Sequence, residues 1–273
     1  MNDQLLAAKN FRELHTNGCF VLPNPWDIGS AIYLKHLGFK ALATTSAGFA
    51  FSRGLRDASV PRDLMLDHLR EIAAATTLPV NADFQGGYAD EAEAVAANVT
   101  RCLATGVAGL SIEDSSGDDN APLYDFGLAV ERIKASRVAI DASGIPVVLT
   151  ARCEAWLVGT PDPLRVVLDR LVAFAEAGAD CLYAPGVAKP DEIAAIVKAV
   201  SPRPINVLVY SGNSALSVAQ LTDLGVRRIS VGAALARVAW GGFIEASRRI
   251  AETGSFKAFA EAAPSNELNE IFS

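Results

Sequence analysis

The chain has 273 residues, of which 51% are hydrophobic, and a formal net charge of −7. This length suits one α/β barrel of about 250 residues, and because no linker-like tract interrupts the sequence we expect a single domain over residues 1–273. The negative charge argues against a nucleic-acid-binding protein. No apolar run is long enough to span a membrane, and residues 1–16 lack the pattern of a secretory signal.

The four cysteines are scattered and form no CxxC pair. Unpaired, scattered cysteines are typical of a reducing compartment, so we expect a cytoplasmic protein. They lie at Cys19, Cys102, Cys153 and Cys181.

The predicted elements alternate between helices and short apolar strands. Residues 1–16 form a polar amphipathic helix, and further helices are predicted at residues 90–105 and 163–177, where apolar side chains recur at helical spacing. Eight strands are predicted between the helices. They centre near Val21, Leu42, Val80, Leu110, Val148, Leu182, Val207 and Ile229.

A helix followed by a glycine and then a strand recurs four times, at Gly38, Gly106, Gly178 and Gly225. Glycine accepts the left-handed conformation that ends many helices. Repetition of this unit builds a parallel sheet, and eight strands in this length favour a closed (β/α)8 TIM barrel over an open sheet. Residues from about 239 to 273 exceed the barrel and predict a C-terminal helical extension for oligomer contacts.

Charged and polar side chains follow the apolar strands. Asp83 and Gln85 end the third strand, Glu113 ends the fourth, and Arg152 ends the fifth. The carboxyl ends of parallel strands converge on one face of a barrel, where the active site lies. The carboxylates of Asp57, Asp83 and Glu113 together predict a Mg²⁺ site, since Mg²⁺ prefers oxygen ligands. The alternative is that they cap helices or pair with arginine.

Two segments are candidates for binding an anion. Ser46, Ala47 and Gly48 offer small side chains and N–H groups that suit a carboxylate, although the same residues fit an ordinary tight turn. Arg152 can bind a carboxylate with two parallel hydrogen bonds, and its alternative partners are Glu113 or Glu154.

Other catalytic patterns are absent from the sequence. His15, His36 and His68 fall on predicted helices away from strand ends, where we expect surface residues, so Ser/His/Asp hydrolysis is disfavoured. Gly-rich phosphate motifs are missing. The loop at residues 114–126 is rich in Gly, Asp and Ser and is either a lid over the barrel mouth or a passive surface loop.

Together these residues resemble the isocitrate lyase/phosphoenolpyruvate mutase superfamily over roughly Asn24 to Gly242. The segments that carry the resemblance are Thr45-Ser46-Ala47-Gly48, Arg56-Asp57, residues 79–88, Ile112-Glu113-Asp114 and Thr150-Ala151-Arg152. The resemblance implies a TIM barrel that processes 2-oxo acids through a Mg²⁺-stabilised enolate, with Mn²⁺ as an alternative metal.

The resemblance also implies a role for each matched residue. Asp83 would hold Mg²⁺ directly, and Asp57 and Glu113 mostly through water. Ser46, Ala47 and Gly48 would bind the carboxylate and carbonyl of a 2-oxo acid, and Arg152 would contact the substrate. We assign Asn206, on the seventh predicted strand, to substrate binding as well. Arg152, Glu113 and Asp57 are the expected catalytic residues.

The sequence departs from the superfamily pattern at three places. Gln85 stands where a second acidic residue is usual, which removes a charge from the metal site. The loop from Ser115 to Phe126 has none of the Cys, Lys and His of the lyase loop, and Pro185 stands where the mutase has a His. These departures leave the exact reaction open.

We expect a Mg²⁺-dependent carbon–carbon lyase or hydrolase acting on a small 2-oxo acid or dicarboxylate, assembled as a homo-oligomer, either a dimer or a tetramer. The alternative within the superfamily is phosphorus–carbon chemistry of the phosphonopyruvate hydrolase or phosphoenolpyruvate mutase type. Rivals from other classes are a Schiff-base aldolase, which needs a Lys at a strand end, and a non-catalytic 2-oxo acid-binding protein.

Overall fold

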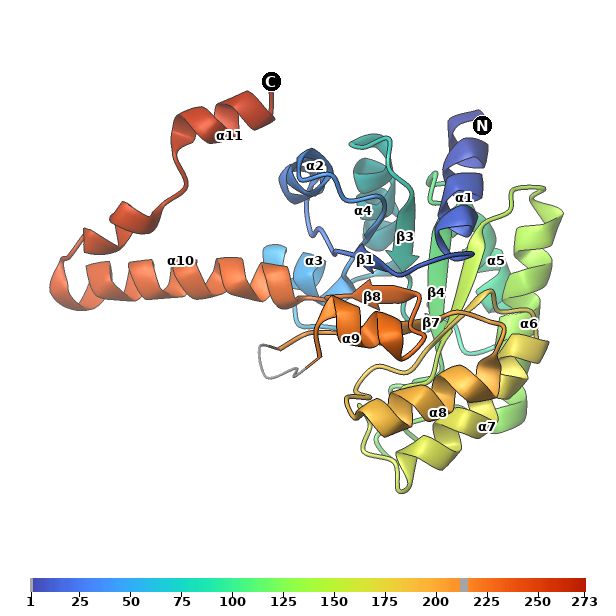
Figure 1. Ribbon diagram of the computed structural model, residues 1–273. Coiled ribbons are helices and arrows are strands. Elements are labelled where there is room, and N and C mark those ends of the chain that lie inside the picture. Colours follow the sequence, from blue (N-terminus) through green and yellow to red (C-terminus); the bar gives the residue numbers. More distant parts are fainter. Residues whose placement is uncertain (1, 212–215) are drawn as a thin grey trace.

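A computed structural model describes residues 2–211 and 216–273 (Figure 1). Eight parallel strands in this part of the chain form one sheet in the order β1-β8-β7-β6-β5-β4-β3-β2. The Ala43 N–H donates to the carbonyl of Pro23 at 3.0 Å, which links the two ends of the sheet. The strands are β1 (Phe20–Leu22), β2 (Leu42–Ala43), β3 (Val80–Asp83), β4 (Gly109–Glu113), β5 (Val148–Arg152), β6 (Cys181–Tyr183), β7 (Ile205–Leu208) and β8 (Arg228–Ser230).

The predicted (β/α)8 TIM barrel is confirmed, and every predicted strand centre falls inside an observed strand. The predicted helices at residues 1–16, 90–105 and 163–177 correspond to α1, α5 and α7. The helices are α1 (Asn2–Leu14), α2 (Ile28–His36), α3 (Ser46–Ser52), α4 (Arg62–Ala74), α5 (Ala92–Leu103), α6 (Phe126–Ala142), α7 (Pro163–Glu176), α8 (Pro190–Val200), α9 (Val218–Asp223), α10 (Ala234–Thr253), the 3-10 helix η1 (Lys257–Glu261) and α11 (Ser265–Ile271).

The four glycines of the repeated unit end helices as predicted. Gly38, Gly106, Gly178 and Gly225 have φ angles of 85°, 95°, 104° and 91°. A side chain at these angles would be strained, so each glycine lets the chain leave a helix and enter the next strand. This local rule produces the alternation that closes the barrel.

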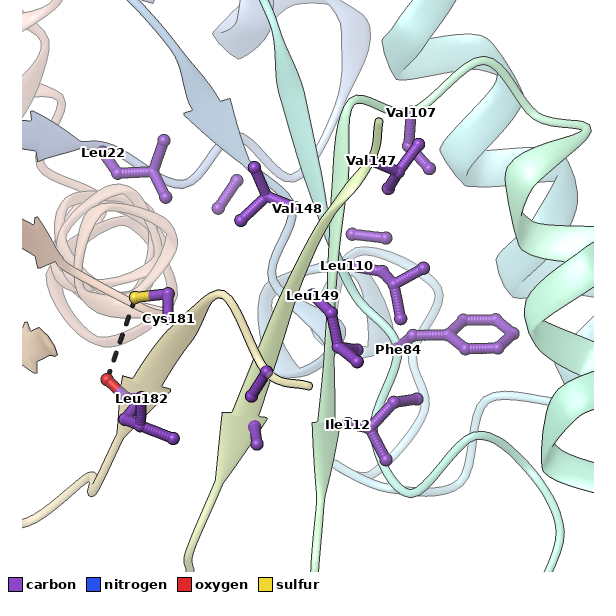
Figure 2. Packing of buried hydrophobic residues seen from close by; sticks show 14 of the residues in the cluster. Leu22, Phe84, Val107, Leu110, Ile112, Val147, Val148, Leu149, Cys181 and Leu182 are labelled. Carbon is purple, nitrogen blue, oxygen red and sulfur yellow. Dashed lines mark hydrogen bonds between the residues drawn. The ribbon is translucent and has the colours of Figure 1, made fainter. Parts of the chain in front are cut away.

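The core lies mainly between the strands and the surrounding helices. Leu110 and Ile112 on β4 and Leu149 on β5 are almost completely buried (Figure 2). The barrel interior differs, because several of its buried side chains are polar, among them Asn81, Asn206 and Arg228. Since TIM-barrel interiors are dominated by bulky branched residues, this polar interior marks a functional region.

The C-terminal segment leaves the barrel. Helix α10 begins at Ala234, five residues before the predicted start, and runs outward with η1 and α11 (Figure 1). Ala236 is the one residue of α10 that is buried. Within the described residues, no helix combines the length and the apolar character needed to cross a membrane.

Candidate active site

A cavity of about 340 Å³ opens at the carboxyl ends of the strands. This is where a TIM barrel places its active site. The predicted site residues that line it are Ser46, Ala47, Asp57, Asp83, Gln85, Glu113, Arg152 and Asn206. Gly48 does not line it.

Arg152 is the centre of the charged groups in this cavity. Its Nη1 lies 2.9 Å from Asp83 Oδ1 and 3.1 Å from Glu113 Oε2, and its Nε lies 2.9 Å from Glu154 Oε1. The barrel explains the convergence, because Glu113 on β4 pairs in register with Arg152 on β5. One guanidinium therefore binds three carboxylates, including both partners that the sequence offered as alternatives to a substrate.

Asp83 links the end of β3 to the start of α3. Its Oδ2 accepts hydrogen bonds from the Ser46 N–H at 2.9 Å and the Ser46 hydroxyl at 2.8 Å. The Asp83 carboxylate thus occupies donors that the sequence assigned to a substrate carboxylate. Ala47, the next residue, is partly exposed to the cavity.

Gly48 has a packing role in this structure. Its N–H donates to Thr45 Oγ1 at 3.2 Å. A Cβ at this position would lie 2.6 Å from Thr45 Cγ2 and 3.2 Å from the Cβ atoms of Trp26 and Ala236. Glycine therefore allows α3 to approach α10 and the loop between β1 and α2 closely.

The cavity concentrates negative charge away from bulk water. Burial raises the pKa of Glu113, against the influence of Arg152, and neighbouring carboxylates raise it further. Burial likewise raises the pKa of Glu154 and of Asp57. Of the arginines that line the cavity, Arg152 is the one that pairs with Asp83, Glu113 and Glu154, so these carboxylates outnumber the positive charge in contact with them, which favours the arrival of a cation.

Gln85 lies in a strained loop that sequence analysis did not anticipate. Its φ angle is 48°, in the left-handed region, and its carbonyl accepts from the Glu113 N–H at 3.0 Å. Arg132 on α6 holds this loop by donating to the carbonyls of Gly86, Ala89 and Asp90. The sign of this contact is the burial of Arg132, which comes from the structure and not from the sequence.

The donor set fits a hard divalent cation that keeps water ligands. Asp57, Asp83, Glu113 and the Gln85 amide all offer oxygen atoms to one cavity. In the described part of the chain, no three or more His, Cys, Asp or Glu side chains are arranged so that they could hold a metal ion together. A Mg²⁺ ion at this cavity would therefore be held by one or two carboxylates, and water and substrate would complete its octahedron.

Strands β6 to β8 contribute residues that sequence analysis left unassigned. Tyr183, Arg228 and Ser230 line the cavity together with Asn206. Asn206 uses both ends of its amide, accepting from Arg228 Nε at 2.9 Å and donating to Ser230 Oγ at 2.9 Å. The available signal was the polar character of strand positions that a barrel interior normally fills with apolar residues.

The loop between β4 and α6 lies outside the cavity. None of residues 115–125, all of which the structure describes, lines it. Ser115 forms an isolated bridge with Leu123, and the Tyr124 hydroxyl donates to Asp90 at 2.5 Å. In this conformation the loop is a surface element.

The expectation that the histidines lie on the surface was wrong for two of the three. His68 is 3% exposed and stacks on Phe49, with ring centroids 3.8 Å apart. His15 is half-buried and packs edge-on against Phe11 and Phe20. His36 is exposed. The prediction from helix amphipathicity was wrong for His15 and His68 because aromatic side chains cover their imidazole rings. None of the three lines the cavity.

Comparison with known proteins agrees with this architecture. The family model described as phosphoenolpyruvate phosphomutase matches residues 11–251. The uncharacterized protein Rv1998c of Mycobacterium tuberculosis is 35% identical over 224 residues, which cover 82% of this chain and 81% of that protein. The 2-methylisocitrate lyase of Salmonella typhimurium is 33% identical over 175 residues, covering 59% of this chain and 57% of the lyase.

Solved structures are similar over nearly the whole chain. A Burkholderia cenocepacia J2315 protein described as a candidate lyase/mutase has a TM-score of 0.96 and 45% identity, covering 100% of this chain and 98% of that one. Oxaloacetate acetylhydrolase in complex with oxalate has a TM-score of 0.86 and 26% identity, covering 98% and 94%. The chain therefore belongs to the phosphoenolpyruvate phosphomutase family, within the isocitrate lyase/phosphoenolpyruvate mutase superfamily.

Proposed function

We propose that this protein is a Mg²⁺-dependent enzyme that cleaves a carbon–carbon bond in a small 2-oxo acid or its precursor, as a lyase or a hydrolase, through an enolate. The observation that carries the proposal is the convergence of Asp57, Asp83 and Glu113 with Arg152 in one cavity at the barrel mouth. Hard oxygen ligands beside a guanidinium suit a substrate that carries both a carboxylate and a carbonyl group.

The metal role is assigned by ligand chemistry. Asp83 would hold Mg²⁺ directly, Asp57 and Glu113 would hold it mostly through water, and the Gln85 amide would supply a neutral oxygen. Mn²⁺, which suits the same oxygen ligands, would substitute for Mg²⁺. When bound, the cation supplies a Lewis acid that stabilises negative charge on the substrate oxygens.

The protein's own groups would bind and orient the acid. Arg152 would contact a substrate carboxylate, since it lines the cavity together with Ser46 and Ala47 at the start of α3. Gly48 would act by letting α3 pack closely rather than by touching the substrate. Asn206 would act from the buried side of the cavity, where its amide is fixed by two hydrogen bonds.

The relatives favour carbon–carbon chemistry over the alternatives. Matches with a stated activity include 2-methylisocitrate lyases and oxaloacetate decarboxylases. Phosphorus–carbon chemistry is the second candidate, and the name of the matching family supports it. A non-catalytic 2-oxo acid-binding protein is the candidate from another class, supported by the position of residues 115–125 outside the cavity.

The deciding experiment is a screen of oxaloacetate, methylisocitrate, isocitrate and phosphonopyruvate with Mg²⁺ or with EDTA. We expect Mg²⁺-dependent formation of a 2-oxo acid or of oxalate from one of the first three. The Asp83→Asn variant corrects for the decomposition of oxaloacetate by free metal. Turnover of phosphonopyruvate alone, either with release of phosphate or by isomerisation to phosphoenolpyruvate, would select phosphorus–carbon chemistry. Binding of all four acids without turnover would select the binding protein.

We also propose that the protein is a homo-oligomer, a dimer or a tetramer, assembled through the C-terminal extension. The large apolar side chains of α10 include Val238, which is 73% exposed, and Phe243, which is 61% exposed. Exposed apolar surface on a helix that leaves its own barrel suits a protein–protein contact.

A further inference from the structure

Cleavage through an enolate requires a proton donor, and the groups assigned so far do not provide one. The bond that breaks leaves an electron pair on a carbon atom, which must then gain a proton. Residues 115–125 contain no Cys, Lys or His. Asp57, Asp83 and Glu113 are assigned to the metal, and Glu154 is bound to Arg152.

Tyr183 is a hydroxyl-bearing residue in a suitable place. It ends β6, lines the cavity and is 9% exposed. It pairs in register with Arg152 on one side and with Asn206 on the other. The guanidinium carbon of Arg152 lies 5.1 Å from the centre of the Tyr183 ring. The phenol is therefore beside the cation that we expect to contact the substrate.

A chain of hydrogen bonds leads to this tyrosine from the barrel interior. Arg228 Nε donates to Asn206 Oδ1 at 2.9 Å, and Asn206 Nδ2 donates to Ser230 Oγ at 2.9 Å. Because Ser230 accepts from Asn206, its own proton is left for another acceptor. Ser230 also lowers the pKa of Tyr183, as a polar group does when it stabilises the phenolate. The two hydrogen bonds thus lead from Arg228 to Ser230.

The charge at the start of this chain has no acidic partner among the described residues. Arg228 is 2% exposed, and its other hydrogen-bonding partners are Thr150 Oγ1 at 3.0 Å and His15 Nε2 at 3.3 Å. Burial and the adjacent Arg228 lower the pKa of His15 to about 3, so the imidazole is neutral. A buried cation with neutral partners is costly, and successive hydrogen bonds polarise one another. The two hydrogen bonds carry this polarisation as far as Ser230.

We propose that Tyr183 is the catalytic proton donor of the reaction, and that Arg228 is a positioning residue that makes it a stronger acid through Asn206 and Ser230. This inference rests on the proposed function. The phenol O–H bond breaks as a new C–H bond forms at the enolate carbon, and the electron pair of the enolate forms that bond while the carbonyl is restored. The phenolate is stabilised by Ser230 and Arg152, and it regains a proton from solvent as the product leaves.

The protonation state of Tyr183 agrees with this role. Burial raises its pKa to about 12, although Arg152 and Ser230 act in the opposite direction. The phenol therefore keeps its proton at neutral pH and is ready to act as an acid. Ser230 and the charge of Arg152, which both lower the pKa of Tyr183, favour the phenolate once the proton has left.

The test compares Tyr183→Phe, which removes only the hydroxyl, with Tyr33→Phe, which removes a hydroxyl from an exposed position on α2 outside the cavity lining. General acid catalysis contributes about 100- to 10,000-fold. We expect Tyr183→Phe to lower kcat at least about 100-fold. Binding of oxalate, a stable planar enolate analogue, should stay within about twofold in a calorimetric titration with Mg²⁺, since the lost hydroxyl acts only in the transition state. Tyr33→Phe should retain its kcat.

Variants of Ser230 and Arg228 test the positioning role separately. Ser230→Ala and Arg228→Gln should lower kcat by about tenfold, the loss expected for about 1.4 kcal/mol, with little change in KM. Because Ser230 acts through the Tyr183 hydroxyl, the double variant Tyr183→Phe/Ser230→Ala should be no slower than Tyr183→Phe alone. If Ser230 had only a structural role, the double variant would have a lower kcat than Tyr183→Phe, because the free-energy losses of the two substitutions would add.

The outcomes separate this inference from the proposed function. A wild-type enzyme that turns over none of the four acids overturns both. Wild-type turnover together with undiminished kcat in Tyr183→Phe overturns the proton-donor role alone. Additive losses in the double variant overturn the chain from Arg228 while leaving Tyr183 as the acid.

Discussion

The Asp83 carboxylate holds the first residue of helix α3, Ser46, through two hydrogen bonds to one oxygen, of 2.9 Å from the backbone N–H and 2.8 Å from the hydroxyl. The other oxygen accepts from Arg152. The residue best suited to bind the metal is therefore also the one that fixes the wall of the cavity. A substitution of Asp83 therefore affects both the proposed metal site and the position of the cavity wall.

Replacing Asp83 with Asn tests the metal role with the least disturbance. The amide keeps the shape and can still accept a hydrogen bond from Ser46, but it loses the charge. We expect Mg²⁺ affinity in a calorimetric titration to fall more than about 100-fold, because outer-sphere partners of a metal alone are worth about 10- to 100-fold. Asp67→Asn, on the exposed face of α4, is the matched control. Equal affinities in the two variants would remove Asp83 from the metal site.

The fold was predictable because its signals are local. Gly38, Gly106, Gly178 and Gly225 end helices through their own backbone preference, and an apolar run identifies a buried strand without knowledge of its neighbours. The acidic residues at the cavity were predictable for a related reason. All parallel strands of a barrel end at one face, so Asp83, Glu113 and Arg152 had to converge.

The rest of the site depends on register, which no single segment encodes. The chain from Arg228 to Tyr183 joins neighbouring strands whose pairing sets Asn206 opposite both residues. Arg132 reaches the Gln85 loop from α6, more than forty residues along the chain. The Ser46 N–H, which the sequence analysis assigned to a substrate carboxylate, instead donates a hydrogen bond to the Asp83 carboxylate of the protein itself.

Acid should destabilise the fold through His68. Burial lowers its pKa in the folded protein from 6.5 to about 4, and its Nε2 has no hydrogen-bonding partner among the described residues. The folded state therefore binds fewer protons than the unfolded state between these values. The neutral imidazole makes its full contribution to the unfolding free energy above pH 6.5, and this contribution is lost as the pH falls toward 4.

Chemical denaturation at pH 7 and pH 5 measures this effect. The wild type should lose about 2 kcal/mol more unfolding free energy than His68→Leu between the two values. His36→Gln, at an exposed position of α2, is the control and should follow the wild type. A wild type and a His68→Leu variant with parallel losses would show that the imidazole is protonated in the folded state.

The C-terminal extension should determine the oligomeric state. Burial of a large apolar side chain in an interface contributes about 1.5–3 kcal/mol, so replacing Val238 and Phe243 with Asp should dissociate the assembly. Light scattering after gel filtration should give a dimer or tetramer mass for the wild type and a smaller mass for the double variant. Arg248→Ala, on the same helix and exposed, should keep the wild-type mass. A wild type that is monomeric at micromolar concentration would contradict the proposed assembly.

Replacing Arg152 with Lys separates substrate binding from support of the barrel. Arg152 binds Asp83, Glu113 and Glu154 through two nitrogens that lie on different edges of its planar group. A single ammonium cannot reproduce this geometry. Breaking a buried ion pair costs about 3–5 kcal/mol, so the melting temperature should fall whichever role is correct.

Turnover decides between the two roles. If Arg152 contacts the substrate and the contact strengthens in the transition state, kcat/KM per folded molecule should fall at least about 100-fold, which corresponds to about 2.7 kcal/mol. Arg170→Lys is the matched control, because Arg170 is a buried arginine that pairs with Asp114 at 3.1 Å but lies outside the cavity lining. It should lose stability and keep its turnover. If Arg152→Lys behaves in the same way as Arg170→Lys, Arg152 serves the scaffold and another group binds the substrate.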